Sequence, residues 1–281
     1  MRGWTLGSGS RGNAILLESA GRFLLVDCGF GPRALATRLK TVGITPEAIE
    51  GLVITHEHVD HASGAVRAQH KWGWPVYASA ATLRALPGIP ARWRRPVRPG
   101  ERVAAGAFAL EAAEIPHDAA APLAFAVTAT ASGARVGVAH DLGAVPDALR
   151  TLFARCDALM IESNHDRQML ADGPYPPSLK VRIRGGRGHL NNDESGGLIA
   201  SLVHPALRSV TLLHLSETNN TPGLAERAVR AIARRAGFRR ALHAAPGRTT
   251  GAAFSLGAAE RATRGSLALG APRQLALGLG L

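Results

Sequence analysis

The chain has 281 residues, of which 46% are hydrophobic and 19% are charged, and its formal net charge is +12. A chain of this length can bury one large core, and no stretch of it reaches the ~18 apolar residues that a membrane-spanning helix needs, so an integral membrane protein is excluded. From Glu226 to the end, ten arginines stand against two glutamates, which places +8 of the charge in the last 56 residues. The basic character therefore supports a polyanionic partner only weakly, because the rest of the chain carries an ordinary charge.

The two cysteines indicate a reducing compartment. Cys28 and Cys156 each lie in an apolar segment, which predicts reduced core residues rather than a disulfide. The first residues include an arginine but no apolar stretch of the kind found in a secretory signal. We therefore expect a cytoplasmic protein with no membrane partner. The sequence gives no indication of its oligomeric state.

The first half of the chain alternates between strand and helix patterns. The predicted elements, in chain order, are strands at 4–6, 14–18 and 23–26, a helix from Pro32, a strand at 51–54, a helix at 63–72 and a strand at 75–77. The glycine-rich segment 7–13 joins the first two strands, and either a plain hairpin turn or a loop that approaches a substrate explains it.

The second half continues the same alternation up to about residue 246. The predicted elements are strands at 108–115, 125–128, 135–139, 158–162 and 209–213 and helices at 146–156, 193–203 and 222–236. Because no linker interrupts this pattern, we expect one α/β domain over residues 1–246. Residues 247–281 contain one acidic residue and no clear period, which predicts a disordered or loosely packed extension.

Polar side chains mark the ends of many predicted strands. They are Asp27, His56, His117, Asp141, His165 and His214. Packing of a core does not require aspartate or histidine at these positions, whereas a site built at one edge of a sheet does. The ends of the strands are therefore the candidate functional region.

The most specific motif is the segment 56–61, which reads His-Glu-His-Val-Asp-His. Four groups able to bind a divalent metal lie within six positions, and burying them without something to coordinate would be costly. His56 and His58 alternate and can point the same way from an extended segment, whereas Asp60 and His61 follow a turn later and can face a second ion. The motif predicts a two-metal site.

The remaining ligands can be assigned in chain order. One ion would be held by His56, His58 and His117, the other by Asp60, His61 and His214, and Asp141 would bridge them. All of these donors are imidazole or carboxylate groups, which suit Zn²⁺ or Mn²⁺, and also Fe²⁺. The sequence therefore predicts two divalent ions as cofactors.

The same residues, in the same order after Asp27, resemble the metallo-β-lactamase superfamily over about residues 1–245. The resemblance implies an α/β (α+β) fold, an αββα four-layer sandwich with the metal site at one edge. It also implies that Asp27 holds the histidine loop in place without binding metal. His140 stands where a small or hydroxyl residue is expected, and we expect it to lie behind the ligands as well.

Six short motifs, taken together, resemble the YycJ/WalJ branch of that superfamily. They are Gly7-Ser8-Gly9-Ser10-x-Gly12-Asn13, His117-Asp118-Ala119, Glu162-Ser163-Asn164-His165-Asp166, Gly173-Pro174-Tyr175-Pro176, Gly188-His189-Leu190-Asn191-Asn192 and His214-Leu215-Ser216-x-x-Asn219-Asn220. The resemblance implies a DNA-processing exonuclease-type hydrolase, in which a hydroxide between the two metals attacks phosphorus. A nucleic acid or another phosphodiester is thus the expected substrate.

Such a hydrolase needs a group that protonates the leaving oxygen. Besides Asp60, the predicted catalytic residues are His165 and His189, either of which could be the acid or orient a phosphate. Both could instead be loop histidines held by Asp166 and Asp193. The basic run 180–187 before His189 suits phosphate contact, although a solvated surface explains it nearly as well.

Four alternative functions share part of this pattern. A thioester or ester hydrolase of the glyoxalase II kind would use the same ligands, and a non-catalytic regulatory accessory protein could keep the fold. A β-lactam hydrolase is disfavoured because the second metal pocket contains no cysteine. A nuclease with a large inserted cap domain is excluded, because only 72 residues separate Asp141 from His214.

Overall fold

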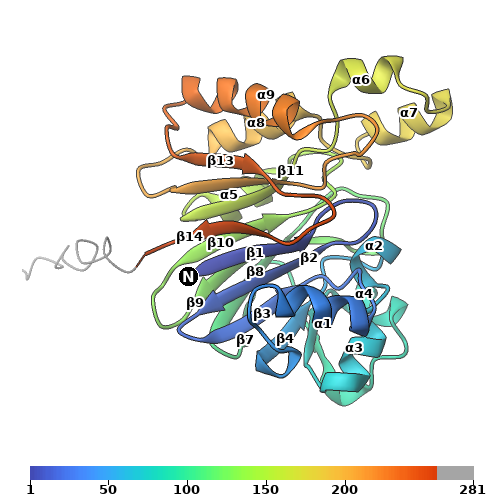
Figure 1. The fold of residues 1–281 in the computed structure, drawn as a ribbon, viewed down its shortest axis with the longest axis vertical. Helices are drawn as coiled ribbons and strands as arrows, with labels where there is room; N and C mark the ends of the chain where they lie inside the picture. The colour runs from blue at the N-terminus through green and yellow to red at the C-terminus, as the bar shows by residue number, and fades with distance from the viewer. Residues whose placement is uncertain (258–281) are drawn as a thin grey trace, which may run out of the picture.

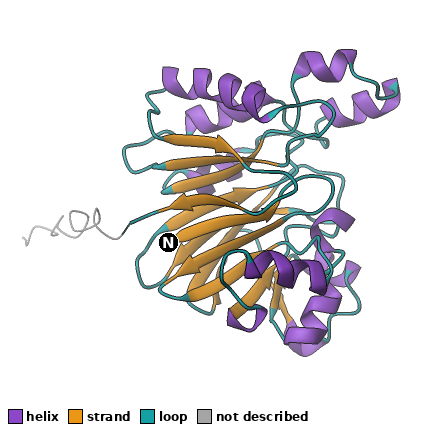
Figure 2. Ribbon diagram, in the orientation of Figure 1, coloured by secondary structure: helices purple, strands orange, loops and turns teal. Residues whose placement is uncertain are grey.

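The computed structural model describes residues 1–257, which form two sheets packed face to face with helices on both outer faces (Figure 1, Figure 2). The first sheet has the spatial order β14 (Gly251–Ser255), β1 (Arg2–Gly7), β2 (Ala14–Ser19), β3 (Arg22–Val26), β4 (Ile49–Val53), β5 (Val76–Ala78) and β6 (Arg94–Pro96). The second has the order β13 (Ala241–Ala244), β12 (Ser209–Leu213), β11 (Ala158–Glu162), β10 (Arg135–Ala139), β9 (Leu123–Ala129), β8 (Phe108–Glu114) and β7 (Arg102–Ala105). The expected αββα sandwich is confirmed.

The helices divide between the two outer faces. Beside the first sheet lie α1 (Pro32–Lys40), α2 (Val59–Ala62), α3 (Ala65–Trp72) and α4 (Ala80–Ala85), with short 3₁₀ turns at Pro46–Ala48 and Ala91–Trp93. Beside the second lie α5 (Asp147–Phe153), α8 (Asn192–Ser201) and α9 (Pro222–Arg235). The remaining two, α6 (Arg167–Asp172) and α7 (Pro177–Arg184), project beyond the second sheet (Figure 1).

Three apolar clusters hold the four layers together. The cluster between the sheets includes Leu17, Phe108 and Phe125, all fully buried, and each of the other two joins one sheet to its helices. Burial of this apolar surface is the main source of stability for such a sandwich. Pro222 begins α9 and Thr221 caps it by accepting a hydrogen bond from Leu224 N–H, which confirms the helix start predicted from the sequence.

The direction of the central strands sets the position of the site. Strands β3 to β6 run parallel to one another, and so do β10 to β13. Parallel strands end at the same edge of a sheet, where ligands commonly bind in α/β folds. The polar residues that follow β3, β4, β10, β11 and β12 therefore meet at one edge of the sandwich.

The expected domain boundary at residue 247 is wrong for the residues that follow it directly. Residues 251–255 form β14, which pairs antiparallel with β1, and Leu256 N–H donates to Met1 C=O at 2.9 Å. Phe254 is only 7% exposed because Gly3 leaves room for its ring. This strand was not predicted because, with few polar residues and two alanines, its sequence shows no clear alternation of apolar and polar residues. The rest of the predicted extension, residues 258–281, lies outside the described residues.

Within residues 1–257, none of the helices combines the length and the apolar character that crossing a bilayer requires. The two cysteines are buried and free, as predicted. Burial raises the pKa of both thiols to about 12, so they are inert core residues.

Candidate metal centre

The backbone is strained where three strands end. Asp27 and His214 directly follow β3 and β12, and Asp141 lies two residues after β10; the φ angles of Asp27, Asp141 and His214 are 61°, 50° and 54°. Among the described non-glycine residues, the one other positive φ is that of Ala20, in the turn between β2 and β3. Left-handed backbone at non-glycine residues occurs mostly where the surrounding structure imposes it, often at functional sites. The three conformations turn these side chains toward one edge of the sandwich.

The loop after β4 supplies the His-x-His-x-Asp-His motif. His56 lies in the extended segment that leaves the strand and is fully buried, whereas α2 places Asp60 and His61 on its first turn. The loop is packed closely against the segment after β3, because a Cβ at Gly29 would meet Asp60 C=O at 1.9 Å. This close approach fixes the position of the second half of the motif.

The structure gathers these residues into two adjacent groups. One group contains His56, His58, His117 and Asp141, and the other contains Asp60, His61, Asp141 and His214. Within each group the nearest donor atoms lie within 4.8 Å of one another. These are the two sets that the sequence order suggested, and Asp141 belongs to both.

Two histidines are oriented from behind by hydrogen bonds. His61 Nδ1 lies 2.8 Å from Asp27 Oδ2, and His56 Nδ1 lies 3.0 Å from Thr55 Oγ1, which itself donates to Asp27. Their Nε2 atoms lie 3.0 and 3.1 Å from Asp141 Oδ2. Holding one ring nitrogen from behind turns the other toward the centre, as outer hydrogen bonds do for metal-binding histidines. Asp27 thus lies where the resemblance implied.

His117 and His58 complete the first group. His117 Nδ1 donates to Gly188 C=O at 3.1 Å, and its Nε2 lies 3.3 Å from His58 Nδ1. His117 Nε2 is also 3.8 Å from Asp141 Oδ2. The free ring nitrogens of this group therefore converge on one point beside the shared carboxylate.

The donor sets fit divalent cations. Burial alone would raise the pKa of Asp141, but His214 and His61 lower it well below its ordinary value. Burial would likewise lower the pKa values of His61 and His214, yet Asp141 raises both well above the ordinary value. Metal ions displace such protons when they bind. In addition, His56 Nε2 and Asp141 Oδ1 are buried and make no hydrogen bond of acceptable geometry, although polar atoms lie 3.1 and 2.8 Å away, and a bound cation would satisfy both.

His140 lies behind the second group. Its ring is 1% exposed, and both of its nitrogens are buried without a hydrogen-bond partner among the described residues. Burial lowers its pKa to about 4, and its ring centroid lies 5.1 Å from that of His61. A neutral imidazole in this position packs against His61, behind the second group.

The sequence analysis gave no role to one buried acid, Glu162, which lies at the end of β11 and opens one of the six motifs. Its side chain is fully buried, and its Oε1 lies 2.7 Å from His189 Nδ1 and 3.2 Å from His214 Nδ1. Its Oε2 accepts hydrogen bonds from the N–H groups of Leu142 at 2.7 Å and Leu190 at 3.2 Å. The available signal was a single acidic residue closing the apolar strand Ala-Leu-Met-Ile-Glu.

The two candidate acids occupy different surroundings. His189 lines a cavity of about 230 Å³ and a smaller one of about 190 Å³ that share His117 and His214. His165 lines neither of these cavities, is 2% exposed, and has a buried Nδ1 without a hydrogen bond. The acids that hold these histidines differ from those suggested by the sequence. Glu162 accepts the hydrogen bond of His189, and Asp166 caps α6.

Residues on both sides of the centre line these cavities. Tyr175, Leu179 and Ile183, from α7 and the loop before it, form an apolar wall of the larger cavity. The predicted basic run lies mainly in α7, from which Arg182 reaches both cavities and bonds Asp118 at 2.9 Å. This arginine is therefore placed beside the centre.

The glycine-rich loop between β1 and β2 is more than a turn. Ser8 Oγ accepts a hydrogen bond from His214 N–H at 2.8 Å, and Asn13 Nδ2 lies 3.0 Å from His61 Nε2. Ser10 lines both cavities. The loop thus supports residues of the second group and also faces the space beside them.

The αββα sandwich and the paired histidine–aspartate groups at its edge define a metal-dependent hydrolase of the metallo-β-lactamase fold. Comparison with known proteins gives the family: the profile described as "Beta-lactamase superfamily domain" (Lactamase_B_2) matches residues 22–215, and the chain belongs to that superfamily. It is 31% identical over 237 residues to exodeoxyribonuclease YycJ of Bacillus anthracis, covering 83% of this chain and 89% of that protein.

Two further comparisons agree. Exodeoxyribonuclease WalJ of Streptococcus pneumoniae is 30% identical over 226 residues, covering 78% of this chain and 83% of that protein. The predicted membership of the YycJ/WalJ branch is thereby confirmed. The crystal structure of the metallo-β-lactamase fold protein YhfI from Bacillus subtilis superposes with a TM-score of 0.66 at 18% identity, covering 89% of this chain and 99% of that one.

Proposed function

We propose that this protein is a metal-dependent phosphodiesterase that acts on nucleic acid as an exonuclease. The observation that carries the proposal is the pair of donor groups sharing Asp141 and opening onto a cavity lined by His189 and Arg182. The relatives named as exodeoxyribonucleases support DNA as the substrate class. The buried thiols suit a reducing compartment, and we place its action in the cytoplasm.

Two divalent ions would be held by the two groups, with Asp141 between them. Zn²⁺ or Mn²⁺, and also Fe²⁺, fit a donor set of imidazole and carboxylate. When bound, such a pair of ions supplies an activated water and neutralises the charge of a phosphodiester.

The chain's own residues would handle the proton and the substrate charge. His189 donates Nδ1–H to Glu162, which leaves its Nε2 free to give a proton to the leaving oxygen. Although burial lowers the pKa of His189, the charge of Glu162 raises it above the ordinary value, so the protonated form is favoured. Arg182, which lines the same cavity, can contact the phosphate. We assign His165 a structural role.

The two carboxylates give a direct test of the metal scheme. Asp60→Ala should leave about one ion per chain, because Asp60 belongs to one group, whereas Asp141→Ala should leave almost none. Both should lose phosphodiester cleavage while keeping the circular dichroism spectrum of the folded parent. Metal content is measured by mass spectrometry after purification without chelators.

Asp147→Ala is the matched control, because it removes a fully exposed carboxylate from α5. It should retain about two ions and the parent rate. Equal metal content in all variants would contradict the assignment of the ligands. The substrate class is tested with bis-(p-nitrophenyl) phosphate, single-stranded DNA, RNA and an S-acyl thiol. Cleavage of the thioester alone would contradict the proposed function and favour a glyoxalase II type of hydrolase.

A further inference from the structure

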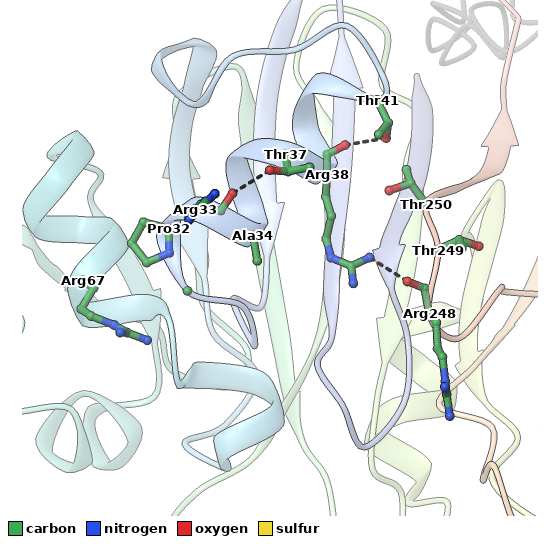
Figure 3. A pocket seen from close by; sticks show the side chains of 11 residues that line it. Pro32, Arg33, Ala34, Thr37, Arg38, Thr41, Arg67, Arg248, Thr249 and Thr250 are labelled. Carbon is green, nitrogen blue, oxygen red and sulfur yellow. Dashed lines mark hydrogen bonds between the residues drawn. The ribbon is translucent and has the colours of Figure 1, made fainter.

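A third, larger cavity lies between α1, α3 and the loop that leads into β14 (Figure 3). Its volume is about 840 Å³, and its charged lining residues are Arg33, Arg38, Arg67 and Arg248. No acidic residue is among those that line it. We call this cavity the arginine groove. A concentration of arginines without acids creates a positive potential that attracts polyanions.

The four arginines differ in what they already bind. Arg38 Nη1 donates to Leu6 C=O at 2.6 Å and to Arg248 C=O at 3.0 Å, and its guanidinium lies 4.1 Å from the centre of the Phe30 ring. It therefore holds the wall of the groove together, as Figure 3 shows. Arg248 pairs with Glu217 at 2.7 Å.

Within residues 1–257, Arg33 and Arg67 have no such partner. Both are exposed, and no acidic side chain of residues 1–257 forms an ion pair with either. They come from different helices, α1 and α3, and Figure 3 shows them on the same side of the groove. Two uncompensated guanidinium groups from separate elements are available for an anionic ligand.

The groove is connected to the metal centre by short paths. Arg11 follows Ser10, which lines the cavities at the centre, and its Nε lies 3.1 Å from Glu217, the partner of Arg248. On the other side, three residues separate the groove residue Gly31 from Asp27, a span of at most about 14 Å. The loop beside the centre and the loop beside the groove are therefore joined through Glu217, and the segment after β3 leads from Asp27 to the groove.

The lining also indicates which part of a nucleic acid would bind. No aromatic side chain is among the groove residues, so the groove offers bases no aromatic ring on which to stack. Guanidinium groups bind phosphate oxygens and carry no sequence information in doing so. The groove is thus suited to a backbone and not to bases.

We propose that the arginine groove binds the sugar–phosphate backbone of a single polynucleotide strand whose end lies at the metal centre. This proposal rests on the proposed function, since it supplies the path of that substrate. It gives the protein a preference for strands of several nucleotides over short fragments, independent of sequence.

The test uses the metal-loaded parent and the double variant R33A/R67A. Fluorescence anisotropy would measure the Kd of a single-stranded twelve-nucleotide DNA and of a dinucleotide at several salt concentrations. The variant should bind the longer strand about tenfold more weakly, and its salt slope should fall by about 1.4, the value for two phosphate contacts on a single strand. The dinucleotide should show no comparable loss of affinity. It is bound at the metal centre and is too short to extend from there to Arg33 and Arg67.

R234A/R235A is the matched control, because it removes two exposed arginines from the end of α9. It should bind the longer strand as the parent does. Unchanged affinity and salt slope in R33A/R67A would overturn the proposal, and so would an equal loss in both double variants. If the parent cleaves no phosphodiester but still binds strands through Arg33 and Arg67, the proposed function is contradicted, whereas the proposed binding of strands in the groove is supported.

Discussion

At the scale of single residues, three side chains of the metal centre are attached to strained backbone. Asp27, Asp141 and His214 keep left-handed backbone at a cost of about 1–3 kcal/mol each. The buried strands that precede them, and hydrogen bonds such as that from His214 N–H to Ser8, hold them there. The placement of the side chains is therefore determined before any ion binds, which favours a centre with fixed geometry.

The role of His189 can be tested through the leaving group. His189→Ala should lower turnover by about 10²–10⁴-fold on a DNA strand, whose leaving oxygen needs a proton. An activated aryl phosphodiester should be affected much less, because its leaving group departs without protonation. The two substrates would be compared at saturating concentration, with the metal content measured in the same sample.

His165→Ala serves as the comparison, because His165 lies outside both cavities of the centre. Its effect should be the same on both substrates. If His165→Ala shows the dependence on leaving group and His189→Ala does not, the assignment of the acid is reversed. A loss of metal from His189→Ala would instead make His189 a ligand, as its 3.6 Å distance from Asp141 permits.

A residue of the centre can be predicted from the sequence when its partners lie close to it along the chain. Four of the donors lie within residues 56–61, where spacing alone indicates a site. The contacts of Glu162 with His189 and His214 join residues 27 and 52 positions apart, and no local pattern reports them. A lone glutamate at a strand end is also common on surfaces, so its burial is visible only in the fold.

At the scale of elements, the buried strands and amphipathic helices were predictable and the short polar ones were not. Strand β11 is buried at every residue and α9 buries Ala225, Val229 and Ala233 at helical spacing. Strands β6 and β7 lie in an arginine- and proline-rich stretch and have three and four residues, too few to show a period. Helix α7 has no fully buried residue, so its sequence has no clear apolar face and only its positive charge was noticeable.

One ion pair ties together three strands of the second sheet. Arg135 on β10 reaches across β9 to Glu111 on β8, with N–O distances of 2.6 and 3.2 Å, and also donates to Thr128 Oγ1. Its hydrogen bond lowers the pKa of Glu111 below the ordinary value of 4.5. A depressed pKa in the folded state stabilises the protein above pH ~4.5, and this contribution is lost as the pH falls through the folded value.

Glu111→Gln should therefore lower the free energy of unfolding by about 1–2 kcal/mol at pH 7. The difference from the parent should shrink as the pH is lowered from 7 to about 3, because the parent carboxylate takes up protons over this range. Urea titrations at both pH values measure it. Glu101→Gln removes an exposed pair with Arg98 and should change little at either pH. A difference that grows on acidification would contradict this account.

At the scale of the whole molecule, β14 closes the first sheet at the edge of β1. A chain ending at residue 246 would lose this strand together with the buried Phe254 and Leu256. Loss of one buried phenylalanine costs about 3–5 kcal/mol, so the unfolding temperature should fall by roughly 10 °C. The exposed edge of β1 should also promote aggregation.

A chain ending at Gly257 is the control, because it retains β14. From the composition of residues 258–281, we expect it to unfold within a few degrees of the parent. Differential scanning calorimetry compares the two truncated chains with the parent. Equal stability of both truncated chains would show that β14 contributes little. A strong loss in the longer one would show that the last residues pack on the domain.

The pairing of β1 with β14 also sets an order of events during translation. The two strands pair from Arg2 with Ser255 to Thr5 with Gly251, so the first strand of the chain meets the last described one. At a synthesis rate of about 5–20 residues per second, one edge of β1 stays open for about 12–50 s after it leaves the ribosome. Strand β1 is thus synthesised early but gains its second neighbour late. A nascent chain that has not yet reached residue 251 has an unpaired edge at β1, to which a chaperone or a second nascent chain could bind.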